Sequence, residues 1–202
     1  MVIGVTGGVG AGKSTVLKIL EKEYGVSLIM ADDVSRELME PGGASYVAVV
    51  SAFGRGILEG SGEETPPIDR KALAKIVFAD EEKLTLLNSL THPTVKSEIK
   101  NRIKEEYVKN PGALIAVEAA LLIEAGYEDM LDCLLVVTAD KESRIARLAA
   151  SRGYSREKSE SVIANQLSEE KFREHADFIV DNSGNIEQTQ QQIAEIMAGF
   201  IS

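Results

Sequence analysis

The chain has 202 residues, of which 22 are basic and 32 acidic, and a formal net charge of −10. This length suits one α/β domain with space for a small inserted subdomain, and leaves little room for a second independent domain. The acidic balance disfavours non-specific binding to nucleic acid or to an anionic membrane, and the single cysteine excludes an intrachain disulfide.

Five short apolar runs predict β-strands along the chain. They cover residues 2–6, 26–30, 113–117, 133–138 and 178–180, and none approaches the roughly 20 residues that cross a bilayer. The segments between them place apolar residues at helical spacing, which is typical of a parallel sheet covered by helices. We therefore predict a cytoplasmic α/β protein with three layers, a parallel five-stranded sheet, Cys133 in the core and a terminal helix that carries Ile186, Ile193, Met197 and Phe200. The sequence leaves the oligomeric state open, and we favour a monomer.

The first apolar run opens directly into the string Gly7-Gly8-Val9-Gly10-Ala11-Gly12-Lys13-Ser14. This Gly-x-x-x-x-Gly-Lys-Ser pattern is a phosphate-binding P-loop, in which backbone N–H groups and the next helix N-terminus face the phosphates of ATP or GTP. Lys13 is expected to reach the β- and γ-phosphates, and the Ser14 hydroxyl to ligate Mg²⁺. A dinucleotide fingerprint is excluded because Lys13 stands where its third glycine would be. The predicted nucleotide-binding residues are Gly8, Val9, Gly10, Ala11, Gly12, Lys13, Ser14 and Thr15.

The connection from the second predicted strand to the third, residues 31–112, is far longer than a parallel crossover needs. Helical patterns occur at 44–53, 70–78, 81–90 and 94–108, and a turn-rich segment with paired prolines covers 54–67. We interpret the insertion as a helical substrate-binding subdomain within the single domain of residues 1–202. The alternative is a helical insertion without a ligand.

A second polar helical region, residues 140–176, follows the fourth predicted strand and is rich in arginine. Arg144 and Arg147 are three residues apart and share a helical face, so their guanidinium groups are candidates to close over a triphosphate as a lid. Arg152 and Arg156 lie further along the same region. The alternative for each arginine is a solvated position on a polar helix.

Several strings that follow the P-loop, taken in order, resemble the dephospho-CoA kinase family over nearly the whole chain. They are Ile29-Met30-Ala31-Asp32, Asp69-Arg70, His92-Pro93, Leu121-Leu122-Ile123-Glu124, Asn165-Gln166 and Asp181-Asn182-Ser183-Gly184. The resemblance implies a P-loop kinase core with a helical CoA subdomain and a mobile lid. It also implies ATP-dependent phosphorylation of the ribose 3′-hydroxyl of dephospho-CoA to give CoA and ADP. The chain departs from the family pattern at Met30, Ala120 and Val162, where aspartate, proline and arginine are common.

Asp32 matches the aspartate that the family uses as its proposed catalytic residue. It follows the second predicted strand, at the sheet edge where the P-loop also emerges, and so is placed to accept the proton of the acceptor hydroxyl. The alternative is an N-cap for a helix that begins near Val34, and we assign that cap to the neighbouring Asp33.

The same resemblance assigns dephospho-CoA binding to Arg70, Lys71, His92 and Glu124, along with Asp32. A guanidinium suits the pyrophosphate of this substrate. The alternative for His92 is a bond to backbone at a helix start, and the alternative for Glu124 is a position on a helix surface. Glu118 ends the third predicted strand and is a weak candidate to hold Mg²⁺ through water. Asn182 is expected beside the adenine of ATP, with an ordinary Asx turn as the alternative.

Two other functions compete with this reading of the sequence. A P-loop kinase for a nucleoside, a nucleotide or shikimate would share the P-loop and lid but lack the Asp-Arg and His-Pro strings. A GTP-dependent switch would need a guanine-reading Asn-Lys-x-Asp string, which the chain lacks.

Overall fold

The computed structural model describes residues 1–60 and 64–201, and these fall into two compact units. The P-loop unit comprises Met1–Ile29 and the chain from Glu106 onward. The helical unit comprises Met30–Glu105. The insertion expected at residues 31–112 therefore begins one residue after the start of the helical unit and extends seven residues past its end.

A five-stranded sheet crosses the P-loop unit. Its strands are β1 (Val2–Thr6), β2 (Ser27–Met30), β3 (Ile115–Glu118), β4 (Cys133–Thr138) and β5 (Phe178–Asp181), in the order β2-β3-β1-β4-β5. β1 pairs in parallel with both β3 and β4, and β4 with β5. The buried β1 therefore lies in the middle of the sheet, and the P-loop leaves from its carboxyl end between two neighbours. The predicted α/β class and the predicted sheet are confirmed.

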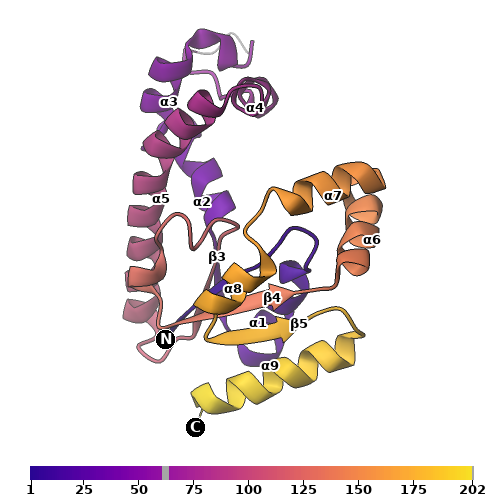
Figure 1. Cartoon of the computed structure of the whole chain (residues 1–202). Helices are drawn as coiled ribbons and strands as arrows, with labels where there is room; N and C mark the ends of the chain where they lie inside the picture. Colours follow the sequence, from indigo (N-terminus) through magenta and orange to yellow (C-terminus); the bar gives the residue numbers. More distant parts are fainter. Residues whose placement is uncertain (61–63, 202) are drawn as a thin grey trace. The chain divides into compact units, whose positions relative to one another are not determined.

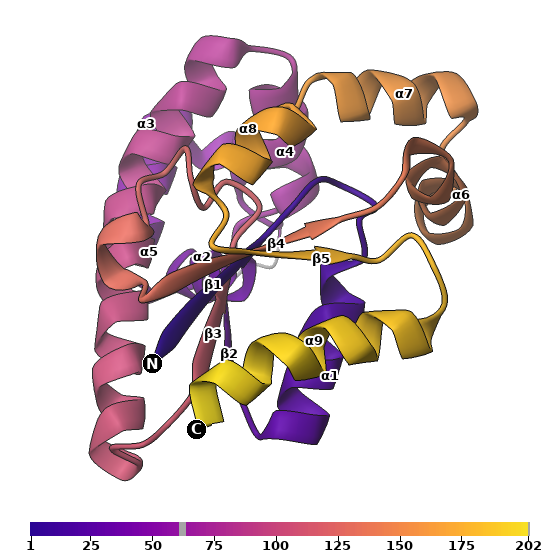
Figure 2. The same cartoon turned by 60° about the horizontal axis from the view of Figure 1, so that its bottom comes forward.

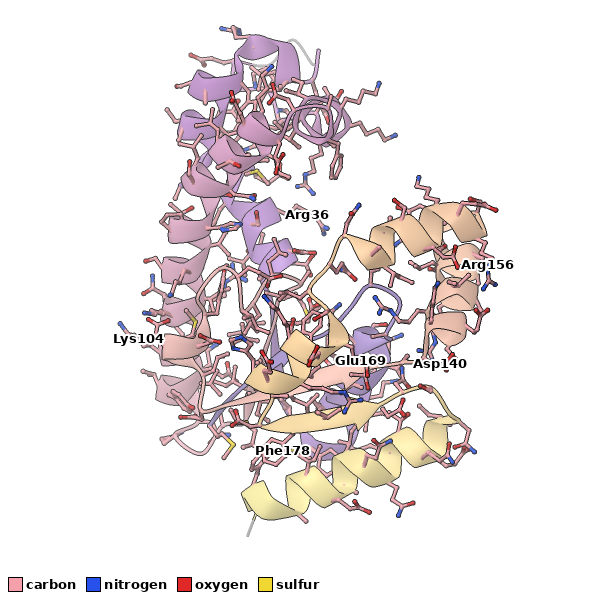
Figure 3. The ribbon with its side chains drawn as sticks, viewed as in Figure 1. Arg36, Lys104, Asp140, Arg156, Glu169 and Phe178 are labelled. Atoms are coloured by element: carbon pink, nitrogen blue, oxygen red, sulfur yellow. The ribbon has the colours of Figure 1, made fainter. Side chains whose placement is uncertain are left out.

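Helices of the P-loop unit cover this sheet (Figure 1). α1 (Lys13–Tyr24) packs against α9 (Ile186–Ile201), which also covers β5 (Figure 2). α8 (Glu169–His175) packs on β4, while α6 (Lys141–Arg152) and α7 (Arg156–Ala164) pack against each other. A short 3-10 helix, η2 (Glu128–Met130), precedes β4. The predicted terminal helix is thus present, with Ile193 and Met197 fully buried in it and Phe200 edge-on to Phe178 of β5, which is labelled in Figure 3.

Four α-helices form the described part of the helical unit: α2 (Ala31–Leu38), α3 (Tyr46–Phe53), α4 (Arg70–Phe78) and α5 (Glu81–Lys109), which continues into the P-loop unit. A short 3-10 helix, η1 (Arg55–Ile57), follows α3, and a single antiparallel bridge joins Leu58 to Ile68. These elements pack on a core of Tyr46, Val49, Ile57, Ile68, Leu73 and Val77. The unit thus has a hydrophobic core of its own.

The structure corrects the predicted break at His92-Pro93. Residues 81–109 form one helix with Pro93 inside it, so no helix starts at His92. A proline in a helix removes one backbone hydrogen bond. Here the flanking Thr91 and Val95 are buried, and the Thr91 hydroxyl donates to the Leu87 carbonyl at 2.9 Å. Packing of the surrounding turns therefore outweighs the local preference of proline to end a helix.

The predicted cap at Asp33 is also wrong. α2 begins at Ala31, its N-cap position is Met30, and no side chain caps it. Because β2 ends at Met30 and the helix follows without a linker, Asp33 lies inside the first turn. Its carboxylate accepts a hydrogen bond at 2.7 Å from Arg36, which is labelled in Figure 3. Asp32 is in the same turn, so it is not the N-cap either.

Two smaller expectations need correction. Cys133 is half-buried, not fully in the core, because it is the first residue of β4, at the amino end of the strand. Burial and the nearby Asp177 and Asp132 raise the pKa of its thiol to about 11. Glu124 is exposed as expected of a surface glutamate, but it lies in a turn after β3 and not on a helix.

Candidate functional site

The P-loop joins β1 to α1 through a tight turn. The Ala11 N–H donates to the Gly8 carbonyl at 3.1 Å, and Gly12 takes a left-handed conformation with φ +91° at the N-cap position of α1. Gly12 has no side chain to cap the helix, and the N-terminus of a helix favours an anion. Glycine is required at this position because a Cβ there would also collide with the Asn182 amide.

Lys13 begins α1 and reaches back across the loop. Its Nζ donates to the Gly7 carbonyl at 3.0 Å and lies 3.7 Å from Oε1 of Glu118. Glu118 ends β3, is buried, and is paired in register with Val5 of β1. A magnesium–nucleotide complex requires a cation, a carboxylate and a hydroxyl. These groups are present here as Lys13, the buried Glu118 and the exposed Ser14, which follows Lys13 in α1.

Arg144 of α6 holds the first half of the P-loop. Its Nε donates to the Val9 carbonyl at 2.8 Å, and its Nη2 donates to Oε1 of Gln166 at 3.0 Å. The guanidinium approaches so closely that a Cβ at Gly8 would collide with it. Burial lowers the pKa of Arg144 from its ordinary value, and the nearby carboxylate of Glu169 opposes this shift.

Arg147, one turn further along α6, holds the second half of the loop. Its Nη1 donates to the Ala11 carbonyl at 3.0 Å and its Nη2 to the Asn182 carbonyl at 2.6 Å. The Asn182 amide also donates to the Ala11 carbonyl at 2.9 Å, and its Oδ1 accepts from the Thr189 hydroxyl at 3.0 Å. Asn182 is buried, so its side chain holds the P-loop through this bond to Ala11. A direct contact of Asn182 with adenine stays a prediction, and the Asx turn here is formed by Asp181, which accepts from the Ser183 N–H.

The other two arginines of the predicted lid lie elsewhere. Arg156 donates to Glu142 at 3.0 Å across α6 and α7, and both Arg156 and the α6 N-cap Asp140 are labelled in Figure 3. Arg152 lies over the ring of Tyr154, with 5.9 Å between its Cζ and the ring centroid. The structure thus separates the predicted set into two arginines that contact the P-loop and two that do not.

Two residues of this site were not predicted with a role. Gln166 belongs to a family string but carried no assigned function, although its Oε1 accepts from the Val9 N–H at 2.8 Å. Thr189 is fully buried on α9, four residues before Ile193 and eight before Met197. A polar residue on this apolar face was the available signal, because a buried hydroxyl needs a partner.

The remaining predicted residues lie in the helical unit. Asp32 is exposed in the first turn of α2, and among the described residues its carboxylate accepts no hydrogen bond. Arg70 and Lys71 begin α4, as predicted, behind an Asp69 cap, and Arg70 forms an ion pair with Glu40. His92 is half-buried on α5, and burial lowers its pKa.

An open hollow of about 700 Å³ lies beside the N-terminus of α4. Its lining is polar and apolar in equal measure, and its charged residues are Glu40, Glu59, Asp69, Arg70 and Lys71. Among the described residues no group of three or more His, Cys, Asp or Glu side chains is arranged to hold a metal ion. No described helix is long and apolar enough to cross a membrane. Magnesium at Ser14 and Glu118 stays a prediction, and such an ion would need further oxygen ligands from a bound nucleotide or from water.

Known proteins resemble this chain over nearly all of its length. The family model described as dephospho-CoA kinase matches residues 1–188. The dephospho-CoA kinase of Carboxydothermus hydrogenoformans is 41% identical over 197 residues, which are 97% of this chain and 92% of that protein. A crystal structure of TT1252 from Thermus thermophilus is 30% identical with a TM-score of 0.79, and covers 98% of this chain and 97% of its own. A shikimate kinase from Acinetobacter baumannii, 15% identical with a TM-score of 0.55 and covering 98% and 93%, shares the fold.

Proposed function

The chain belongs to the dephospho-CoA kinase family, and from this membership we propose which residues carry out its reaction. The family reaction is the final step of coenzyme A biosynthesis: ATP phosphorylates the ribose 3′-hydroxyl of dephospho-CoA to give CoA and ADP. We assign substrate docking to residues 31–112 and the lid to residues 140–176. The observation that supports a kinase reaction most directly is the arrangement of Lys13, Arg144 and Arg147 about one glycine loop.

ATP is proposed to bind with its phosphates against the P-loop N–H groups and the N-terminus of α1, from Gly8 to Thr15. Lys13 then moves from the Gly7 carbonyl to the β- and γ-phosphates, a short movement because its Nζ already lies at the loop. Ser14 and Glu118 would hold Mg²⁺, the latter through water. The bound ion neutralises charge on the phosphate oxygens. Arg144 and Arg147 add positive charge where negative charge develops during transfer.

Dephospho-CoA is proposed to bind through Arg70, Lys71, His92 and Glu124, with Asp32 at the reacting hydroxyl. Asp32 follows β2 directly, and the carboxyl ends of parallel strands are where open α/β sheets bind ligands. Its exposed carboxylate accepts the hydroxyl proton as that oxygen forms a bond to the γ-phosphorus and the bond to ADP breaks. The open hollow lined by Arg70 and Lys71 supports a docking role for these two cations.

The test is ADP release by purified protein with Mg·ATP and, in separate reactions, dephospho-CoA, AMP, uridine, shikimate or no acceptor. Release with dephospho-CoA alone, with a product that co-migrates with CoA, is the expected result. Release with shikimate or a nucleoside would overturn the acceptor, and acceptor-independent hydrolysis alone would overturn the kinase reaction.

We further propose a monomer in the cytoplasm that needs neither a membrane nor nucleic acid. The net charge of −10 supports the lack of a nucleic acid partner. Light scattering of the purified chain in the presence of Mg·ATP would measure its mass directly.

A further inference from the structure

Gln166 closes a ring of three hydrogen bonds with the P-loop and the lid. It lies in the connection between α7 and α8, and its Oε1 accepts from the Val9 N–H at 2.8 Å and from Arg144 Nη2 at 3.0 Å. Arg144 Nε completes the ring by donating to the Val9 carbonyl at 2.8 Å. One side-chain oxygen therefore joins segments that are 157 residues apart in the chain.

The ring uses both acceptor sites of the Gln166 oxygen and both polar groups of the Val9 residue. It also fixes the Arg144 guanidinium at two of its three nitrogens. Because the guanidinium is planar and rigid, these two bonds determine where the third nitrogen, Nη1, points. Among the described residues Nη1 forms no hydrogen bond, so its two N–H groups are left for a ligand.

We propose that Gln166 is a positioning residue for phosphoryl transfer, acting through Arg144 and the Val9 peptide. It holds the Arg144 guanidinium so that Nη1 faces the transferring phosphate, and it keeps the P-loop turn in the shape that binds ATP. This proposal rests on the role proposed above for Arg144. An uncharged acceptor suits the position, since a carboxylate would offer the same two acceptors but would add negative charge beside a triphosphate.

The first experiment replaces the acceptor with an apolar side chain of similar size, Gln166→Leu. We expect kcat to fall about tenfold to a hundredfold, the cost of a displaced charged group at a reacting centre, while the KM for dephospho-CoA stays within about twofold. The same change at an exposed position of α9, Gln191→Leu, is the matched control, because among the described residues that side chain bonds to Glu195 alone, on its own helix. Thermal unfolding with and without Mg·ATP shows whether each variant is folded and binds nucleotide.

The second experiment is a double-mutant cycle with Arg144→Ala. If Gln166 acts through Arg144, adding Gln166→Leu to Arg144→Ala lowers kcat by less than about twofold further, whereas independent effects would multiply. Multiplying effects, a wild-type kcat for Gln166→Leu, or a loss explained by unfolding alone would each overturn the proposal. Failure of the proposed function is separate, because the wild-type chain would then form no CoA.

Discussion

The two units hold their candidate residues in different ways. In the P-loop unit, Lys13, Arg144, Arg147 and Asn182 each donate a hydrogen bond to a carbonyl of the loop. In the helical unit, Asp32 is exposed without a hydrogen-bond partner among the described residues, and Arg70 forms an exposed ion pair with Glu40. The candidate residues of the P-loop unit are therefore held by hydrogen bonds to the loop backbone, whereas Asp32 and Arg70 of the helical unit face solvent or an exposed side chain.

This difference matches the two tasks of a kinase. Charge stabilisation in the transition state benefits from groups that are already in place, because no reorganisation is needed during the reaction. Substrate docking tolerates groups that change partners. The exposed Arg70–Glu40 pair contributes on the order of 0–1 kcal/mol, so exchanging Glu40 for a substrate phosphate costs little.

Asp32→Asn is the sharpest way to break this contrast, because it tests whether an exposed residue is indispensable. We expect kcat to fall by about 10² to 10⁴, the usual contribution of a general base, with ATP binding unchanged. The neighbouring variant Asp33→Asn is the control, since Asp33 is exposed and, in the part of the chain that the structure describes, bonds to Arg36 alone. Steady-state CoA formation measures both variants. Turnover of Asp32→Asn within about threefold of the wild type would rule out its role as base.

Removing the guanidinium of Arg70 tests the docking side. Arg70→Gln is expected to raise the KM for dephospho-CoA about tenfold to a hundredfold, because a hydrogen bond to a charged group contributes about 1.5–3 kcal/mol. The KM for ATP and the stability should be nearly unchanged, since the lost ion pair is exposed. Arg55→Gln, in η1 of the same unit, provides a control with equal loss of charge. An unchanged KM for dephospho-CoA would remove Arg70 from the substrate site.

The sequence predicts most of what is local. Apolar runs locate the five strands to within about two residues, and the glycine string locates the loop with Lys13 and Ser14. The prediction from sequence fails where packing determines whether a helix continues. Pro93 lies inside a continuous helix because buried Val95 and Ile99 hold the turns on its far side.

Partners of polar side chains are harder still to predict from sequence. The Asn182 amide bonds to Ala11, 171 residues away, and which carbonyl it meets is set by the order of strands in the sheet. The same holds for Gln166 and Val9. Residue type and spacing identify such side chains as polar residues at buried positions, but only the fold shows which groups they form hydrogen bonds with.

Thr189→Val tests whether the loop is held in place from α9. The change removes a buried hydroxyl and leaves Oδ1 of Asn182 with one donor fewer, so we expect a loss of about 1–3 kcal/mol in the free energy of unfolding. Thr189→Ser, which keeps the hydroxyl, should lose less. Urea denaturation measures both variants. Equal stability of the valine variant and the wild type would mean that the Asn182 amide holds Ala11 without this support.

The smallest expected effect is a pH dependence that comes from the helical unit. Burial lowers the pKa of His92 in the folded protein, whereas the unfolded chain has a histidine pKa near 6.5. As the pH falls below about 6.5, the unfolded state takes up a proton that the folded state does not, so the free energy of unfolding decreases until the folded pKa is reached. His92→Gln should therefore flatten the decline of the wild type between about pH 6.5 and 5, as measured by urea denaturation at a series of pH values. Equal slopes for the two proteins would mean that His92 is solvated enough to take up its proton in the folded state.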